Sequence, residues 1–129
     1  MEEEEKKWTL AEFNLLSPER KNGKYTFYNG TVSWWEKGYL HREEEPALFD
    51  ESGYYWYKHG FLHREDGPAI IKINGDELWY KEGKCHRLDG PAIERVYEGS
   101  SWFIEGKRYS EEEWKRLSYI ILNNLEVFL

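Results

Sequence analysis

The sequence predicts a mainly β protein, in which antiparallel β-hairpins follow one another along the chain and a C-terminal α-helix caps them. Three observations lead to this fold class. The pattern Trp-x-x-x-Gly-x-x-His-Arg-x-Asp-Gly-Pro-Ala recurs at steps of 22 or 23 residues. Short runs rich in Tyr, Trp, Ile and Val are cut by Asn-Gly and Glu-Gly pairs, which is typical of hairpins. A sustained helical periodicity begins only after the last copy of the pattern.

The pattern has two complete copies, which begin at Trp56 and Trp79, and two decayed copies. Self-similarity at such a period indicates stacked units, because one unit alone cannot bury its apolar face. We assign structural roles to the recurring residues. They are Trp34, Trp56, Trp79, Trp102, Gly60, Gly83, His63, His86, Arg64, Arg87, Asp66 and Asp89.

Backbone geometry, hydrogen bonding and packing account for each recurring position of the pattern within this chain. Glycine supplies positive φ in a turn, aspartate accepts turn amides and pairs with arginine, and proline fixes φ at the start of a strand. Alanine leaves room for a neighbouring tryptophan. Histidine is expected to pack along the stack and to bond a backbone carbonyl.

Each unit is expected to form two antiparallel strands. Residues 76–81 form the first strand, Glu82-Gly83 the turn, and the return begins at Lys84 and bends at residues 89–91 before a strand over 92–97. The Asn29-Gly30 and Asn74-Gly75 pairs predict tight hairpins of type I′, in which both central residues need positive φ.

The chain is expected to be one domain, 1–129, with a lead-in and short helix over 1–23, hairpins over 24–109 and a helix over 110–129. Residues 1–7 should fray, and residues 8–16 suit a helix or turn on the first edge of the stack. The C-terminal helix should start at a capping box and run to about Val127. The box is Ser110 to Glu113, and the apolar stripe is Trp114, Leu117, Ile121, Leu125 and Phe128. Further apolar residues at 120, 122, 127 and 129 leave open a homodimer through this helix.

The charge balance excludes some partners. The 129-residue chain has a net charge of −7, and residues 34–105 hold 15 acidic against 9 basic side chains. Such a surface repels phosphate backbones, so we expect no direct binding of DNA or RNA. No segment suits a signal peptide or a membrane span, so a soluble, cytoplasmic protein without a membrane partner is expected. The only cysteine, Cys85, stands where Leu40 and Leu62 stand in other units and should be a small buried hydrophobe.

Residues 79–86, with their tryptophan, turn glycine and histidine, resemble the MORN repeat, which has a 23-residue period and a β-hairpin unit. The resemblance covers about residues 25–109 and implies a MORN-like meander or solenoid. Where MORN units usually continue His-Gly-x-Gly, this chain has His-Arg-x-Asp-Gly-Pro-Ala, a variant similar to repeats in bacterial antitoxin-like and phage or viral proteins. The resemblance implies binding and not catalysis.

The His-Arg-x-Asp pattern is the only recurring polar constellation, so a His–Asp base or a metal site would have to begin there. Its recurrence once per hairpin argues against a single active centre, and no nucleophile or phosphate loop accompanies it. We therefore expect no enzyme, and assign no catalytic residue, cofactor or metal ligand. A small-ligand or metal site along a row of His41, His63 and His86 is an alternative.

Trp35 is out of register with the repeated tryptophans and, by strand alternation, should face away from Trp34. With Tyr55, Tyr57 and Tyr80 it is the candidate partner-binding surface, since Tyr and Trp anchor interfaces. The predicted function is a non-catalytic protein-interaction module, as in an antitoxin or a virus-encoded inhibitor in the host cytoplasm, whose partner has a basic surface. An acidic mimic of nucleic acid that blocks a DNA- or RNA-binding enzyme is a further alternative.

Overall fold

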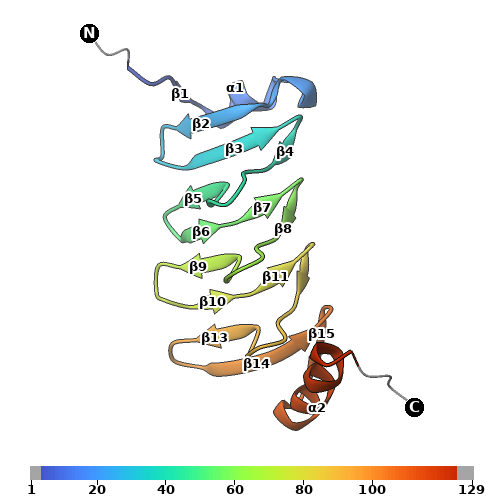
Figure 1. Ribbon diagram of the computed structural model, residues 1–129. Coiled ribbons are helices and arrows are strands. Elements are labelled where there is room, and N and C mark those ends of the chain that lie inside the picture. The colour runs from blue at the N-terminus through green and yellow to red at the C-terminus, as the bar shows by residue number, and fades with distance from the viewer. Residues whose placement is uncertain (1–3, 125–129) are drawn as a thin grey trace.

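The computed structural model describes residues 4–124. It shows hairpins stacked between two short helical segments at one end and a longer helix at the other (Figure 1). The elements are β1 (Lys7–Trp8), α1 (Leu10–Asn14), the 3-10 helix η1 (Pro18–Arg20), β2 (Gly23–Phe27), β3 (Val32–Glu36), β4 (Tyr39–Leu40), β5 (Leu48–Asp50), β6 (Gly53–Tyr55), β7 (Tyr57–Lys58), β8 (Phe61–Leu62), β9 (Ile70–Lys72), β10 (Glu77–Leu78), β11 (Tyr80–Lys81), β12 (Lys84–Cys85), β13 (Ile93–Arg95), β14 (Gly99–Ile104), β15 (Lys107–Tyr109) and α2 (Glu111–Leu122).

The strands form one long sheet and two small ones. The 11-stranded sheet has the order β1-β2-β3-β5-β6-β9-β10-β13-β14-β15, with β4 paired to β3. The pairs β7–β8 and β11–β12 stand apart, along one edge of the stack in Figure 1. The mainly β fold with antiparallel strands and a C-terminal helix is confirmed. The pair β1–β2 is parallel, however, so the long sheet is mixed.

Trp56 and Trp79 mark the places where the chain passes from the long sheet to a small hairpin, whereas Trp34 and Trp102 lie within β3 and β14. The Trp56 N–H donates to the Ala69 carbonyl at 2.7 Å, and the Trp56 carbonyl accepts from the His63 N–H at 3.0 Å. The same two bonds, at the same lengths, join Trp34 to Ala47 and His41, and Trp79 to Ala92 and His86. The strand expected over residues 76–81 is therefore divided at Trp79 into β10 and β11.

The hairpin turns are of two kinds. Glu82 and Gly83 both have left-handed φ, 50° and 81°, as a type I′ turn requires. In the Asn74-Gly75 turn only the glycine does, with φ 99°. There the asparagine Oδ1 accepts the N–H of Asp76 at 3.0 Å, and Asn29-Gly30 is built in the same way. The type I′ prediction was wrong for the Asn-Gly pairs, because the asparagine side chain stabilises a different turn.

Small side chains line the centre of the stack. Ala47, Ala69 and Ala92 are fully buried. Ala92 forms a buried cluster with Ile93 and Cys85, against which Trp79 packs. Alanine thus leaves room for the tryptophan, and Cys85 is the buried hydrophobe that the sequence predicted.

The N-terminal segment covers the first strand of the stack. Thr9 caps α1 by accepting the Glu12 N–H at 3.1 Å. Phe13, buried on this helix, packs edge-on against Tyr25 with ring centroids 5.0 Å apart. The short helix on the first edge is confirmed. The expectation that residues 1–7 fray was wrong for Lys7, which pairs with Thr26 as part of β1.

The C-terminal helix closes the other end. The Ser110 hydroxyl accepts the Glu113 N–H at 3.2 Å, which confirms the predicted start. The helix ends at Leu122 with Asn123 as its C-cap, earlier than the predicted Val127. Trp114 is buried, but Ile121 of the predicted stripe is exposed and Ser118 is buried instead. Residues 125–129, with the stripe residues Leu125 and Phe128, lie outside the described part of the chain, and a homodimer through this helix stays a prediction.

Trp114 fixes the helix to the last hairpin. Its ring lies on that of Trp102, with centroids 4.6 Å apart, and its Nε1–H donates to the Arg87 carbonyl at 2.9 Å. Within residues 4–124, no helix is long and apolar enough to cross a membrane.

We expect Trp114→Ala to lower the free energy of unfolding by about 3–5 kcal/mol, because it leaves a cavity against Trp102 and frees a buried carbonyl. Urea unfolding followed by circular dichroism measures the change. Tyr119→Ala on the exposed side of α2 is the matched control and should change stability by less than about 0.5 kcal/mol. Equal losses in the two variants would contradict the capping role of Trp114.

Candidate functional site

The recurring arginine, histidine and carboxylate side chains gather on three loops, residues 41–46, 63–68 and 86–91. We call the surface formed by these loops the loop face. Each loop is held by an arginine. The Arg64 guanidinium carbon lies 4.0 Å from the Trp56 ring centroid, and Nη1 donates to the Pro68 carbonyl at 3.1 Å. In the other loops, Arg42 lies 3.7 Å from Trp34 and 3.3 Å from the Pro46 carbonyl, and Arg87 lies 3.9 Å from Trp79 and 3.0 Å from the Pro91 carbonyl.

The glycine of Asp-Gly-Pro makes room for this arginine. A Cβ at Gly67 would lie 2.8 Å from Cζ of Arg64, and one at Gly90 would lie 2.7 Å from Cζ of Arg87. Neither glycine has a left-handed φ. The interpretation that glycine supplies positive φ was therefore wrong for Gly67 and Gly90, although it holds at Gly83.

The first loop shows what happens without that glycine. Glu45 stands at the place of Gly67, and its carboxylate pairs with the Arg42 guanidinium. The preceding Glu44 adopts a left-handed φ of 61°. A side chain at this place is thus accommodated by a strained backbone.

The histidines link each loop to the next hairpin. His63 Nδ1 accepts the Glu82 N–H at 2.9 Å, and the side chain of His63 is about nine-tenths buried. His41 and His86 accept the N–H groups of His59 and Glu105 in the same way, at 3.0 and 2.9 Å. The expected bond from histidine to a carbonyl was wrong, since each ring accepts from an amide.

These bonds fix the tautomer of the rings. Because Nδ1 accepts a hydrogen bond, the proton of the neutral ring is on Nε2. His63 Nε2 lies 2.9 Å from Glu65, and this hydrogen bond, with the nearby Lys81, lowers the pKa of the Glu65 carboxyl. Asp66 pairs with Arg64 at 3.6 Å, and Asp89 with Arg87 at 2.9 Å. The aspartates of these two loops thus pair with arginine as predicted, and the carboxylate beside Nε2 of His63 is that of Glu65.

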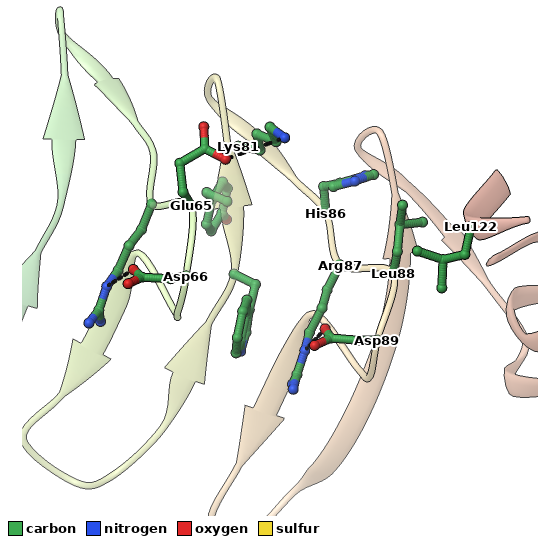
Figure 2. Close-up of a pocket in the computed structure, with 11 residues that line it drawn as sticks. Glu65, Asp66, Lys81, His86, Arg87, Leu88, Asp89 and Leu122 are labelled. Atoms are coloured by element: carbon green, nitrogen blue, oxygen red, sulfur yellow. Dashed lines mark hydrogen bonds and ion pairs between the residues drawn. The ribbon is translucent and has the colours of Figure 1, made fainter. Parts of the chain in front are cut away.

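Two hollows lie between the loops. One, of about 310 Å³, lies between the first and second loops, beside Trp56. The other, of about 350 Å³, lies between the second and third loops and reaches Leu122 of α2 (Figure 2). Figure 2 shows the Arg87–Asp89 pair and, in the equivalent place of the preceding loop, Asp66.

On the loop face, the carboxylate side chains are exposed to solvent and the arginine side chains are largely buried. The side chains of Arg42, Arg64 and Arg87 are 28%, 25% and 17% exposed, because each lies on a tryptophan. The carboxylate side chains of Glu43, Glu65, Asp66 and Asp89 are 72%, 67%, 89% and 73% exposed. The face is therefore anionic towards solvent although each loop carries an arginine.

The predicted aromatic surface is partly covered. Trp35 packs against Phe13 of α1, with ring centroids 4.9 Å apart. The Tyr55 hydroxyl is bonded to Ser52 Oγ at 2.6 Å. Tyr57 and Tyr80 are half-buried, and burial raises the pKa of both phenols.

Other aromatic residues are more exposed than these. Tyr39 and Phe61 are exposed at the hairpin tips. Each lies on the turn glycine of the next hairpin, Gly60 or Gly83. Their shared position, five residues after a repeated tryptophan, is a signal that could have identified them from the sequence.

The structure also brings together Glu36, His41 and His59, which the sequence analysis did not group. The rings of His41 and His59 stack with centroids 4.3 Å apart. His59 lies outside the His-Arg-x-Asp pattern, so the repeat alone does not identify it.

We expect Gly67→Ala to lower the free energy of unfolding by about 1–3 kcal/mol, because the new methyl overlaps the Arg64 guanidinium. In an Arg64→Ala background the same change should have a clearly smaller effect, since the overlapping group is gone. Urea unfolding of the four proteins of this cycle gives the coupling energy. Equal effects in both backgrounds would contradict the packing role of Gly67.

Burial raises the pKa of the Cys85 thiol to about 11, from an ordinary value of 9.0. The thiolate is the reactive form, so at pH 8 we expect alkylation of the folded protein to be about 100-fold slower than that of a free cysteine. Iodoacetamide labelling followed by mass spectrometry measures the rate, and labelling in urea is the control. A folded rate equal to the urea rate would show that the thiol is not protected.

Comparisons with family models, with curated proteins and with solved structures gave no significant match for this chain.

Proposed function

We propose that the protein is a non-catalytic protein-interaction module whose loop face binds a partner with a basic surface. One observation carries the proposal: the loops turn their guanidinium groups inward onto tryptophan and leave their carboxylates in solvent. An exposed anionic face speeds the encounter with a basic protein and selects against acidic ones.

Two features of the loop face suit a binding role. The arginine of each loop bonds a proline carbonyl, and the histidine bonds an amide of the next hairpin. Among the polar atoms of the pattern, Arg64 Nε and Trp79 Nε1 are buried without a hydrogen-bond partner from the described part of the chain. The hollows beside Trp56 and Trp79 offer apolar surface between carboxylates, and each also has one lysine in its lining, Lys58 or Lys81. A basic side chain with an aliphatic stem would compete with that lysine for the carboxylates.

We further propose that the hairpins form a divergent MORN-type repeat array. Three successive units make the same tryptophan–alanine, arginine–proline and histidine–amide bonds, and this equivalence supports the proposal. Together with the sequence resemblance, it favours an antitoxin or a virus-encoded inhibitor that acts in the cytoplasm.

The mimic of nucleic acid is less well supported. It requires carboxylates gathered on one face, whereas exposed acids also occur at the hairpin tips, as at Glu82 and Glu105, and in the first turn of α2, as at Glu112. The histidine row is also less favoured, because the one group of metal-ligand atoms within 4.8 Å among residues 4–124 joins His41 to Glu36 and His59, and includes neither His63 nor His86.

The test is affinity purification of the tagged protein from its native cells, with quantitative mass spectrometry. The loop-face variant is Glu43→Gln/Glu65→Gln/Asp66→Asn. The control variant Glu51→Gln/Glu98→Gln/Glu112→Gln removes the same charge from exposed positions elsewhere. We expect a basic protein to be recovered equally with wild type and control, and on the order of 10-fold less with the loop-face variant.

Equal recovery with all three proteins would show that another surface binds the partner. Equal loss from both variants would show that net charge alone matters. Trp35→Ala is not a clean test of binding, because Trp35 packs against Phe13 and its loss would disturb α1.

A further inference from the structure

Four side chains converge at the tip of the first hairpin. Glu36 from the end of β3, and Glu43 from the first loop, each place a carboxylate oxygen 3.1 Å from Nε2 of His41. The His59 ring, from the turn between β7 and β8, stacks on His41 with an interplanar angle of 29°. One ligand atom each from Glu36, His41 and His59 lie within 4.8 Å of one another, and this is the one such group among residues 4–124.

The charges of this cluster are not balanced by the chain. His41 accepts the His59 N–H on Nδ1, so its neutral ring has a single proton, on Nε2. Two carboxylates face that one proton. Within the described residues, the ion pairs of Glu36 and Glu43 are to His41 alone. A cation at this place would offset the repulsion between the two carboxylates.

We propose that Glu36, His41 and His59, with Glu43 as a fourth ligand, bind a divalent transition metal of the Zn²⁺ type. Imidazole nitrogen and carboxylate oxygen are common ligands of this ion, at about 2.0–2.2 Å. Two ligand atoms on a tetrahedral Zn²⁺ lie roughly 3.4 Å apart. The ligand atoms of Glu36, His41 and His59 therefore need to close in by up to about 1.4 Å, which the exposed Glu36 and His59 can do by rotation.

In the next unit, His63 makes the same bond to a turn amide as His41 does, but other residue types surround it. Around His63, Lys58 takes the place of Glu36, and Glu82 the place of His59. Lys58, His63, Glu65 and Glu82 line one hollow, in which the lysine supplies the positive charge. In the third unit Lys81, Leu88 and Glu105 take the places of Glu36, Glu43 and His59. The bond from the histidine to the next turn amide is the same in all three units, so at this place the first unit differs from its neighbours in residue type.

Metal binding changes a hydrogen bond that can be observed. When Nε2 of His41 donates its lone pair to the metal, the ring proton moves to Nδ1, and the His59 N–H loses its acceptor. Two N–H donors would then face each other, so the His59 turn has to move away from the ring. The cost of about 1–3 kcal/mol for a donor left without its acceptor is small beside the binding energy of a zinc site. The His59 amide should therefore respond to the metal, while the amides of Glu82 and Glu105 should not.

The experiment is calorimetric titration of ZnCl₂ into EDTA-stripped protein near pH 7.5, where neutral histidine is available. We expect wild type to bind one equivalent. Glu36→Lys and His59→Glu, which introduce the residue types of the second unit, should weaken binding on the order of 10- to 100-fold. The control His86→Gln changes a histidine with the same backbone bond and should bind as wild type does. In ¹⁵N spectra, zinc should shift the His59 amide.

A variant designed to create a second zinc site tests the proposal even if Glu36→Lys or His59→Glu fails to fold. Lys58→Glu/Glu82→His gives His63 the residues that surround His41, and we expect it to bind a second equivalent. The proposal is overturned if wild type binds no zinc, if His86→Gln loses binding as Glu36→Lys does, or if zinc leaves the His59 amide unchanged. None of these outcomes depends on the protein partner proposed above.

Discussion

The packing of one arginine between a tryptophan ring and a glycine is the contact on which the rest of the structure depends. Arg64 lies on Trp56, reaches the Pro68 carbonyl and fills the space that a side chain at Gly67 would occupy. A cation on an aromatic ring contributes about 0.5–2 kcal/mol, and a hydrogen bond from a charged donor about 1.5–3 kcal/mol. The arginine lies on a tryptophan in all three loops and against a glycine in the second and third, and it fixes the path of each loop between one hairpin and the next.

That contact also determines the electrostatics of the surface. The sequences of the three loops together hold six carboxylates against three guanidinium groups. Once the guanidinium lies on tryptophan, the arginine faces the protein and the acids face solvent. The geometry therefore strengthens the negative charge that the loop face presents to solvent, and the proposed choice of a basic partner rests in part on the same stacking that holds the loop in place.

The sequence predicted the features that arise within one unit. The period located the tryptophans, the capping box located the start of α2, and the place of Cys85 among leucines predicted its burial. The exposed aromatic surface was harder to predict, because α1 covers Trp35 and nothing in the local alternation of the strand reveals that helix. Predictions also failed where a residue from elsewhere in the chain determines a contact. The N–H group that donates to His63 is 19 residues away, so the spacing within one unit does not predict this hydrogen bond. Gly67 is required by the packing of the Arg64 side chain and not by its own φ. The cluster at His41 needs residues of two units and the loop between them, so no spacing within one unit identifies it.

Each histidine of the loop face accepts a hydrogen bond from the hairpin that follows it in the chain. This regularity has a consequence for the insertion or deletion of whole hairpins. Each unit offers a turn amide to the histidine before it, and the donor is a backbone group that any residue supplies. If residues 56–78 were deleted, His41 would meet the turn amide of Glu82 in place of that of His59, and the same type of bond would form at the junction. Duplication of a unit has the same property. A gene encoding this chain can therefore gain or lose whole hairpins by recombination without a new kind of contact, whereas a deletion of part of a unit would leave an arginine without its tryptophan.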